Sequence, residues 1–325
     1  MTTNRTKTIT IATTLIVAVA AAALLTLSPT LRDTAGDSSA PRSDDRTRVD
    51  LMARVTDYTA RFGPDTGYRE PSRSDREAIA HGVALLLDGE RKQAQRRLSD
   101  IDFTLHTLTD SVSGRRYTEI ADRTDDGSAP RGWGRVYVAE DSTPGDRRWT
   151  VQVPHPVADR NTERLGVGVL RGSRGGIMVI AGAHRKAGED GAADVAHRRD
   201  TVFDAVCDTL AERGRPAVQL HGFADDSAPR HDVVASTGRG SVARAEGRLL
   251  ADALGERDFA VCRAWARTCP LAGHTNVQGR KAEAEHVPFL HIELSNRIRT
   301  DERHTARAVA AIGLVTDLWR KGERP

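Results

Sequence analysis

The sequence predicts an α/β fold in three layers, in which a mixed, mostly parallel sheet is covered by helices on both faces. The first observation is a set of four short apolar runs after residue 148, at 149–154, 176–183, 216–220 and 287–290. The second is a set of helix-like stretches between them, chiefly 194–213, 241–254 and 302–319. The third is that each run leads into a histidine or a glutamate. Apolar strands that alternate with helices are typical of a sheet buried on both faces.

The amino terminus has the pattern of an export signal. Arg5 and Lys7 precede an uncharged, apolar stretch, residues 9–27. At 1.5 Å per residue this stretch reaches about 28 Å, enough to span a hydrocarbon core. Residues 1–27 are therefore predicted to be a signal peptide or a signal anchor, and the rest of the chain is predicted to be extracytoplasmic, either secreted or membrane-anchored. Residues 28–50 are polar and proline-containing, and they are expected to form a disordered linker.

Residues 51–148 are predicted to form a small α+β region. Ser74 and Asp75 are expected to begin a helix that ends at Asp88-Gly89, and residues 91–99 are expected to form a second helix. Short β-like pieces follow at 102–108, 115–121 and 134–139. Clusters of residues suited to catalysis or metal binding occur only in residues 149–325, the predicted α/β domain.

Composition excludes several classes of protein. Of the 325 residues, 29% are charged, which excludes a polytopic membrane protein. A net charge of +3 and only 4% aromatic residues give no indication of a nucleic-acid partner. The three cysteines are too few for a disulfide scaffold, although Cys262 and Cys269 are close enough in sequence to pair in an exported protein.

Each strand of the predicted sheet delivers a polar residue to the same edge. The first run leads into His155, the second into His184-Arg185, the third into His221-Gly222, and the fourth through His291 to Glu293. Ligands of open α/β sheets bind at the carboxyl ends of the strands. Asp159 and Glu163 follow His155 in the first loop. We therefore expect a cluster of imidazoles and carboxylates there.

Two imidazoles and one carboxylate are a standard protein ligand set for catalytic zinc. A site of this kind also needs a carboxylate that is not a ligand and that accepts the proton of the attacking water. Glu293 suits that role, because it follows a strand and is far in sequence from the candidate ligands.

At these residues the chain resembles a family of zinc hydrolases. The segments 155–163 (HPVADRNTE), 220–223 (LHGF) and 291–297 (HIELSNR) look like motifs of phage-type poly-γ-glutamate hydrolases and, more distantly, of N-formylglutamate amidohydrolases. The resemblance covers roughly residues 150–320. It implies a zinc-carboxypeptidase-like fold, Zn²⁺ as the cofactor, and hydrolysis of amides next to a free or side-chain carboxylate.

The resemblance also implies roles for individual residues. His155 and His221 match the histidine ligands, and Glu293 matches the general base. Asp159 matches the carboxylate ligand, but its spacing from His155 differs from the usual one, so Glu163 stays an alternative.

The remaining candidates surround this site. His197 is an alternative metal ligand, and Arg185 and Arg198 are candidates for binding an acidic substrate, because a guanidinium pairs with a carboxylate through two hydrogen bonds. The resemblance implies that Arg297 or Arg299 also lies near the substrate. The GxSxG motif of serine hydrolases is absent from the sequence.

The sequence therefore predicts an exported, zinc-dependent amidohydrolase or peptidase that acts on an acidic amide: a γ-glutamyl compound, an N-acyl amino acid or a cell-wall peptide. Two alternatives stay open. One is a non-catalytic cell-envelope protein of the same fold that binds a metal or an anion, and the other is a structural domain whose histidines only pack.

Overall fold

The computed structural model describes residues 48–65 and 67–325. The predicted signal or anchor segment, and nearly all of the predicted linker, lie outside the described residues. Within the described part, no helix has both the length and the apolar character needed to cross a membrane.

Helices and strands occur in groups in the first part of the chain, and from residue 149 onward they mostly alternate. The first half contains β1 (Arg48–Val49), α1 (Leu51–Thr59), α2 (Arg73–Leu87), α3 (Arg91–Ser99), β2 (Phe103–Asp110), β3 (Arg116–Asp122), the 3₁₀ turn η2 (Arg123–Asp126), β4 (Arg135–Ala139), β5 (Trp149–Val153) and α4 (Thr162–Gly172). The second half contains β6 (Gly176–Ile180), the 3₁₀ turn η3 (Glu189–Gly191), α5 (Val202–Glu212), β7 (Ala217–Phe223), β8 (Val233–Ser236), α6 (Arg244–Gly255), β9 (Val261–Arg263), α7 (Val277–Ala284), β10 (Phe289–Ser295), α8 (Asn296–Thr300) and α9 (Glu302–Lys321).

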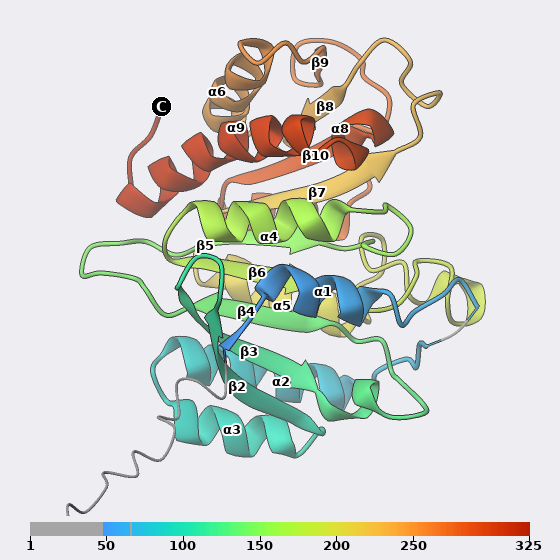
Figure 1. Cartoon of the computed structure of the whole chain (residues 1–325), viewed down its shortest axis with the longest axis vertical. Helices are drawn as coiled ribbons and strands as arrows, with labels where there is room; N and C mark the ends of the chain where they lie inside the picture. Colours follow the sequence, from blue (N-terminus) through green and yellow to red (C-terminus); the bar gives the residue numbers. More distant parts are fainter. Residues whose placement is uncertain (1–47, 66) are drawn as a thin grey trace, which may run out of the picture. The chain divides into compact units, whose positions relative to one another are not determined.

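The ten described strands form one mixed sheet, with the order β1-β2-β3-β4-β6-β5-β7-β10-β8-β9 (Figure 1). The central strands β6, β5, β7 and β10 are parallel to one another. β4 pairs antiparallel with β6, and β8 pairs antiparallel with β10. The predicted α/β class and the mixed, mostly parallel sheet are confirmed.

The strands of residues 51–148 do not form a sheet of their own. They continue the central sheet, because β4 pairs antiparallel with β6, with Val136 opposite Val179 and Tyr137 opposite Met178. The boundary predicted between residues 148 and 149 therefore falls inside one continuous sheet.

Helices cover the sheet on both faces. Successive side chains of a strand point to opposite faces of the sheet, so each face has its own layer of apolar side chains. One face carries Val151, Val153, Leu220 and Ile292, and packs against α1, α4, α6 and α9. The other face packs against α2 and α5 near β4 and β6, and against α7 near β7 and β10. Figure 1 shows α4 and α9 in front of the sheet and α5 behind it.

Two predicted elements differ in extent. The helix expected over 194–213 begins only at Val202, because the hydroxyl of Thr201 accepts a hydrogen bond from the backbone N–H of Asp204 and caps the helix there. The third strand does not end before His221: β7 runs to Phe223, and its backbone pairs with β10 over its whole length. Cys262 and Cys269 form a disulfide, as expected from their spacing. Cys207 is buried in α5 and is not part of a disulfide.

We expect the substitution Glu119→Gln to destabilise the sheet. Glu119 on β3 is fully buried, and its carboxylate accepts hydrogen bonds from both Arg54 and Arg135. Removing the charge leaves two guanidinium groups facing a neutral amide, and breaking a buried ion pair in this way costs about 3–5 kcal/mol. Urea denaturation measures the change. The control Glu77→Gln breaks an exposed pair with Arg73 on α2 and should cost less than about 1 kcal/mol. Equal effects of the two substitutions would contradict this account.

Candidate metal centre

The candidate site lies at the carboxyl edge of the three central strands β5, β7 and β10. His155 lies two residues beyond the end of β5, His221 lies in β7, and Glu293 lies in β10. Glu293 is the register partner of His221, so their side chains stand beside each other on the same face of the sheet. All three residues are buried.

The turn after β5 brings Asp159 to the two histidines. The backbone N–H of Asp159 donates to the carbonyl of His155, which closes one turn of chain. Asn161 then adopts φ = 69° and α4 begins at Thr162. Residues four apart across a closed turn lie on the same side, so His155 and Asp159 face each other.

His155, Asp159 and His221 form a compact group of ligand atoms. Oδ2 of Asp159 lies 3.6 Å from Nδ1 of His155 and 3.5 Å from Nδ1 of His221. Donor atoms bound to one tetrahedral zinc ion at about 2.0 Å would lie about 3.3 Å apart. Each of the three residues offers one donor atom within 4.8 Å of the others. The spacing of the group therefore fits a zinc ion.

The hydrogen bonds of His155 direct its Nδ1 lone pair toward this group. Nε2 of His155 lies 2.8 Å from Oδ1 of Asp194, whose other oxygen accepts from Arg185. Burial acts to raise the pKa of Asp194, but its hydrogen bonds to His155 and His197 hold it well below the usual range. An ionised carboxylate only accepts, so Nε2 carries the proton. Nδ1 of His155 is buried and has no hydrogen-bond partner among the described residues.

A network of buried amides orients His221 in the same way. Nε2 of His221 lies 2.7 Å from Oε1 of Gln219, which also accepts from Asn276. The amide nitrogen of Gln219 donates to Gln152 and Gln278, so its oxygen faces the imidazole. Nε2 of His221 is therefore the donor, and Nδ1 presents its lone pair to Asp159.

The charge states of the group suit a cation. Burial acts to raise the pKa of Asp159, but the neighbouring His155 and His221 hold it well below the usual range. Burial lowers the pKa of His221, so its imidazole is neutral at pH 7. One carboxylate with two imidazole nitrogens is a ligand set found in catalytic zinc sites.

We expect the substitution Asp194→Ala to weaken zinc binding. It leaves Nε2 of His155 without its acceptor, so the imidazole can rotate and can change tautomer. The loss of such a supporting hydrogen bond typically lowers metal affinity by about 10–100-fold. Zinc titration against a competing chelator measures the effect. The control is Asp200→Ala in the same loop, because Asp200 pairs with Arg198 and does not contact His155. If Asp194→Ala leaves the zinc affinity unchanged, the orienting role is wrong.

Glu293 stands next to the group. Burial, and after it the charge of Asp159, raise the pKa of Glu293 to about 8. Its Oε1 lies 4.0 Å from Nε2 of His291, and the ring of His291 stacks on His221 with 4.4 Å between centroids. His221, His291 and Glu293 are a second set with ligand atoms within 4.8 Å of one another. The carboxyl of Glu293 is thus held beside the donor group.

The alternative ligands proposed from the sequence, Glu163 and His197, belong to neither set, and neither does His184, which follows the second apolar run. Glu163 lies buried in the first turn of α4, where burial raises its pKa. The ring of His197 is 42% exposed and contacts Asp194 at 3.2 Å. His184 lies four residues beyond the end of β6 and accepts a hydrogen bond from the backbone of Lys186. Among these candidates, Asp159 is the carboxylate that faces both His155 and His221.

The three candidate substrate-binding arginines lie in two places. Arg185 and Arg198 line a surface pocket of about 760 Å³ together with Asp194 and His197. Arg297 is 57% exposed, lies 3.6 Å from Asp232, and lines a different hollow of about 370 Å³. Asp194 thus joins Arg185 to the candidate ligand His155.

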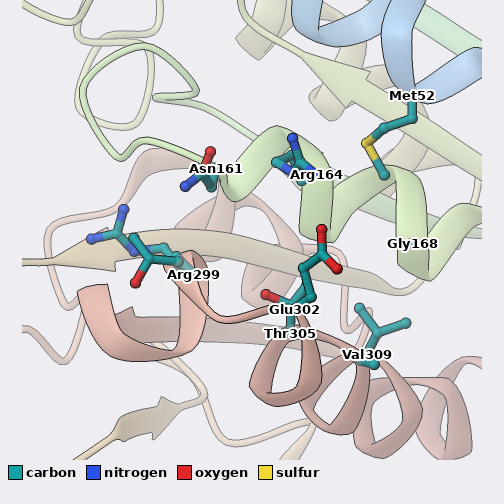
Figure 2. Close-up of a pocket in the computed structure, with 10 residues that line it drawn as sticks. Met52, Asn161, Arg164, Gly168, Arg299, Glu302, Thr305 and Val309 are labelled. Atoms are coloured by element: carbon teal, nitrogen blue, oxygen red, sulfur yellow. The ribbon is translucent and has the colours of Figure 1, made fainter.

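Arg299 has a structural position. Its guanidinium donates to the backbone carbonyls of Arg160, Phe223 and Leu294, which ties the turn after β5 to the ends of β7 and β10. It also lines the pocket of about 530 Å³ in Figure 2, which lies between α4 and the start of α9. The candidate ligands and Glu293 do not line that pocket.

Comparison with known proteins gives matches to solved structures alone. No family model matches the chain, and no curated protein matches it. N-formylglutamate amidohydrolase from Ralstonia eutropha JMP134 matches with a TM-score of 0.38 and 14% identity, over 55% of this chain and 93% of that one. A metallo-carboxypeptidase from Pseudomonas aeruginosa matches with 0.38 and 16%, over 71% and 69%.

LapA aminopeptidase from Legionella pneumophila matches with a TM-score of 0.36 and 11% identity, over 91% of this chain and 80% of that one. The matches thus include N-formylglutamate amidohydrolase, which the sequence motifs resemble, and metallo-carboxypeptidases, whose fold that resemblance implies. The function proposed for this chain is therefore based on the positions of its own residues.

Proposed function

We propose that this chain is a zinc-dependent amide hydrolase, an amidohydrolase or peptidase, that acts outside the cytoplasm on an acidic substrate. The observation that carries the proposal is the buried group of His155, Asp159 and His221 with Glu293 beside it. The two imidazoles are oriented by separate hydrogen bonds, so the donor set is preorganised.

Each residue has a role that follows from its position. His155, Asp159 and His221 would hold the ion. When bound, zinc supplies a water of lowered pKa and polarises the carbonyl of the substrate. In its ionised form Glu293 would accept the proton of the attacking water and pass it to the leaving amine, because it is the carboxyl group beside the set of His155, Asp159 and His221 and is not a member of that set.

The charges near the site favour an acidic substrate. Arg185, Lys186 and Arg198 line the pocket beside Asp194, together with Asp190 and His197. A guanidinium there can pair with a substrate carboxylate through two hydrogen bonds. Substrates of this kind are γ-glutamyl compounds, N-acyl amino acids and cell-wall peptides.

An extracytoplasmic location is supported by the disulfide between Cys262 and Cys269, because disulfides persist mainly in oxidising compartments. The basic residues and the apolar stretch at 9–27 support export as well.

The test is a measurement of zinc content followed by a substrate screen. The proposal predicts about one zinc ion per chain, and hydrolysis of at least one member of a panel of γ-glutamyl, N-acyl amino acid and cell-wall peptide amides. Bound zinc without any hydrolysis would support the non-catalytic binding protein instead. Absence of zinc after incubation with the metal would contradict both.

A further inference from the structure

Another pocket lies at the opposite edge of the sheet from the candidate metal centre. It has a volume of about 360 Å³ and lies where the central strands begin: Pro216 precedes β7 and Pro288 precedes β10. The carboxyl end of α9 forms another wall, through Trp319 and Gly322. In Figure 1 this is the end of α9 from which the chain runs to its carboxyl terminus. The pocket shares no residue with the candidate metal centre.

Four arginines line this pocket: Arg147, Arg213, Arg215 and Arg324. Arg213 is paired with Asp88 through two hydrogen bonds. Within the described residues, the other three side chains have no carboxylate within ion-pair distance. The pocket also contains Glu246 and Glu323, so the arginines outnumber the glutamates four to two.

The arginines of this region lie close enough to disfavour one another's charge. Burial, and after it the charge of Arg213, lower the pKa of Arg215. Burial, and after it the charge of Arg215, lower the pKa of the neighbouring Arg148. Like charges gathered at one partly buried place are stabilised when an anion binds between them.

Two buried donors in the pocket lack acceptors. Nε of Arg215 and the indole Nε1 of Trp319 are buried without a hydrogen-bond partner among the described residues. Trp319 itself is only 4% exposed. By contrast, the indoles of Trp133 and Trp149 donate to backbone carbonyls. Buried donors are nearly always paired in folded proteins, so these two indicate an acceptor that is supplied from outside the chain.

We propose that this pocket binds a phosphate group. A phosphate carries several acceptor oxygens in a tetrahedral array, which can accept from arginines on different walls and from the indole at the same time. A planar carboxylate pairs with a single guanidinium fork and would leave the remaining donors unpaired. The source is either a soluble phosphate compound or the phosphate of a lipid headgroup. The inference does not depend on the proposed hydrolase function.

The test is isothermal titration of the full-length protein with inorganic phosphate. We expect saturable binding that weakens at least about tenfold in Arg215→Gln. We also expect weaker binding in Trp319→Phe, which removes the indole N–H and retains an aromatic ring. The control is Arg257→Gln, because Arg257 is a half-buried arginine outside the pocket that donates to the carbonyl of Ala253. Thermal melts verify that each variant is folded.

A phosphate could also bind to a metal ion at the candidate centre. The titration is therefore repeated in His155→Ala/His221→Ala, where phosphate binding should persist. Binding of phosphatidylglycerol vesicles that requires Arg215, in addition to phosphate binding, would identify a lipid headgroup as the source. Phosphate binding without vesicle binding would identify a soluble compound. Absence of saturable phosphate binding, or equal affinities of Arg215→Gln and Arg257→Gln, would overturn the proposal.

Discussion

The substitution Glu293→Gln should lower kcat for amide hydrolysis by at least about 100-fold while the protein stays folded and retains zinc. Glutamine has nearly the same shape as glutamate but cannot accept the proton of the attacking water, and positioned proton transfer typically contributes about 10²–10⁴-fold to a rate. The measurement is kcat and KM on the substrate found by the screen, together with zinc content.

The matched control for this variant is Glu163→Gln. Glu163 is also buried and lies near the same turn, but it belongs to neither set of candidate ligands. Its glutamine variant should keep its zinc and hydrolyse within about threefold of the wild-type rate. Full hydrolysis by Glu293→Gln would remove the assigned general base. Loss of zinc in Glu163→Gln would instead favour Glu163 as a ligand.

The second large effect is expected for His155→Ala/His221→Ala. This variant removes both nitrogen donors of the group, and two of its three ligand atoms. Its zinc affinity should fall by more than the roughly 100-fold that loss of one supporting hydrogen bond produces. Equilibrium dialysis followed by elemental analysis measures the bound metal.

The control pair is His81→Ala/His106→Ala, because both residues are exposed and lie far along the chain from the site. It changes the number of histidines by the same amount, so it accounts for nonspecific zinc binding to imidazole. Stoichiometric zinc in His155→Ala/His221→Ala would remove the proposed metal centre. An equal loss in both pairs would show that the zinc binds at the surface.

The central strands could be predicted because each is an apolar run of strand length beside a helical pattern. Buried runs such as 176–180 leave little choice of structure, and β6 occupies these residues. The continuation of one sheet through both predicted regions could not be predicted from apolar runs and helical patterns. It depends on the pairing of β4 with β6, whose partners are about 40 residues apart in sequence, and the local pattern carries no information about that pairing.

The candidate ligands could be predicted from their places at the ends of strands, but the residues that orient them were missed. Gln219 contacts His221 two positions along β7 and reaches Gln152 on the neighbouring strand β5, and Asp194 reaches His155 across 39 positions. Such contacts exist only after the sheet has formed.

One signal was present in the sequence. In 218–221 and 290–295, apolar residues alternate with polar ones, which predicts a strand with one polar face. That polar face contains Gln219, His221, His291 and Glu293, and it extends through the strands rather than starting at their ends.

The most direct test of the metal centre is anomalous diffraction at the zinc edge from crystals of the zinc-loaded protein. The account predicts one strong peak within bonding distance, about 2.0–2.2 Å, of Nδ1 of His155, Nδ1 of His221 and a carboxylate oxygen of Asp159. A peak bound by Glu163 or His197 in place of Asp159 would contradict the ligand set. Zinc found only at surface histidines would contradict the central claim.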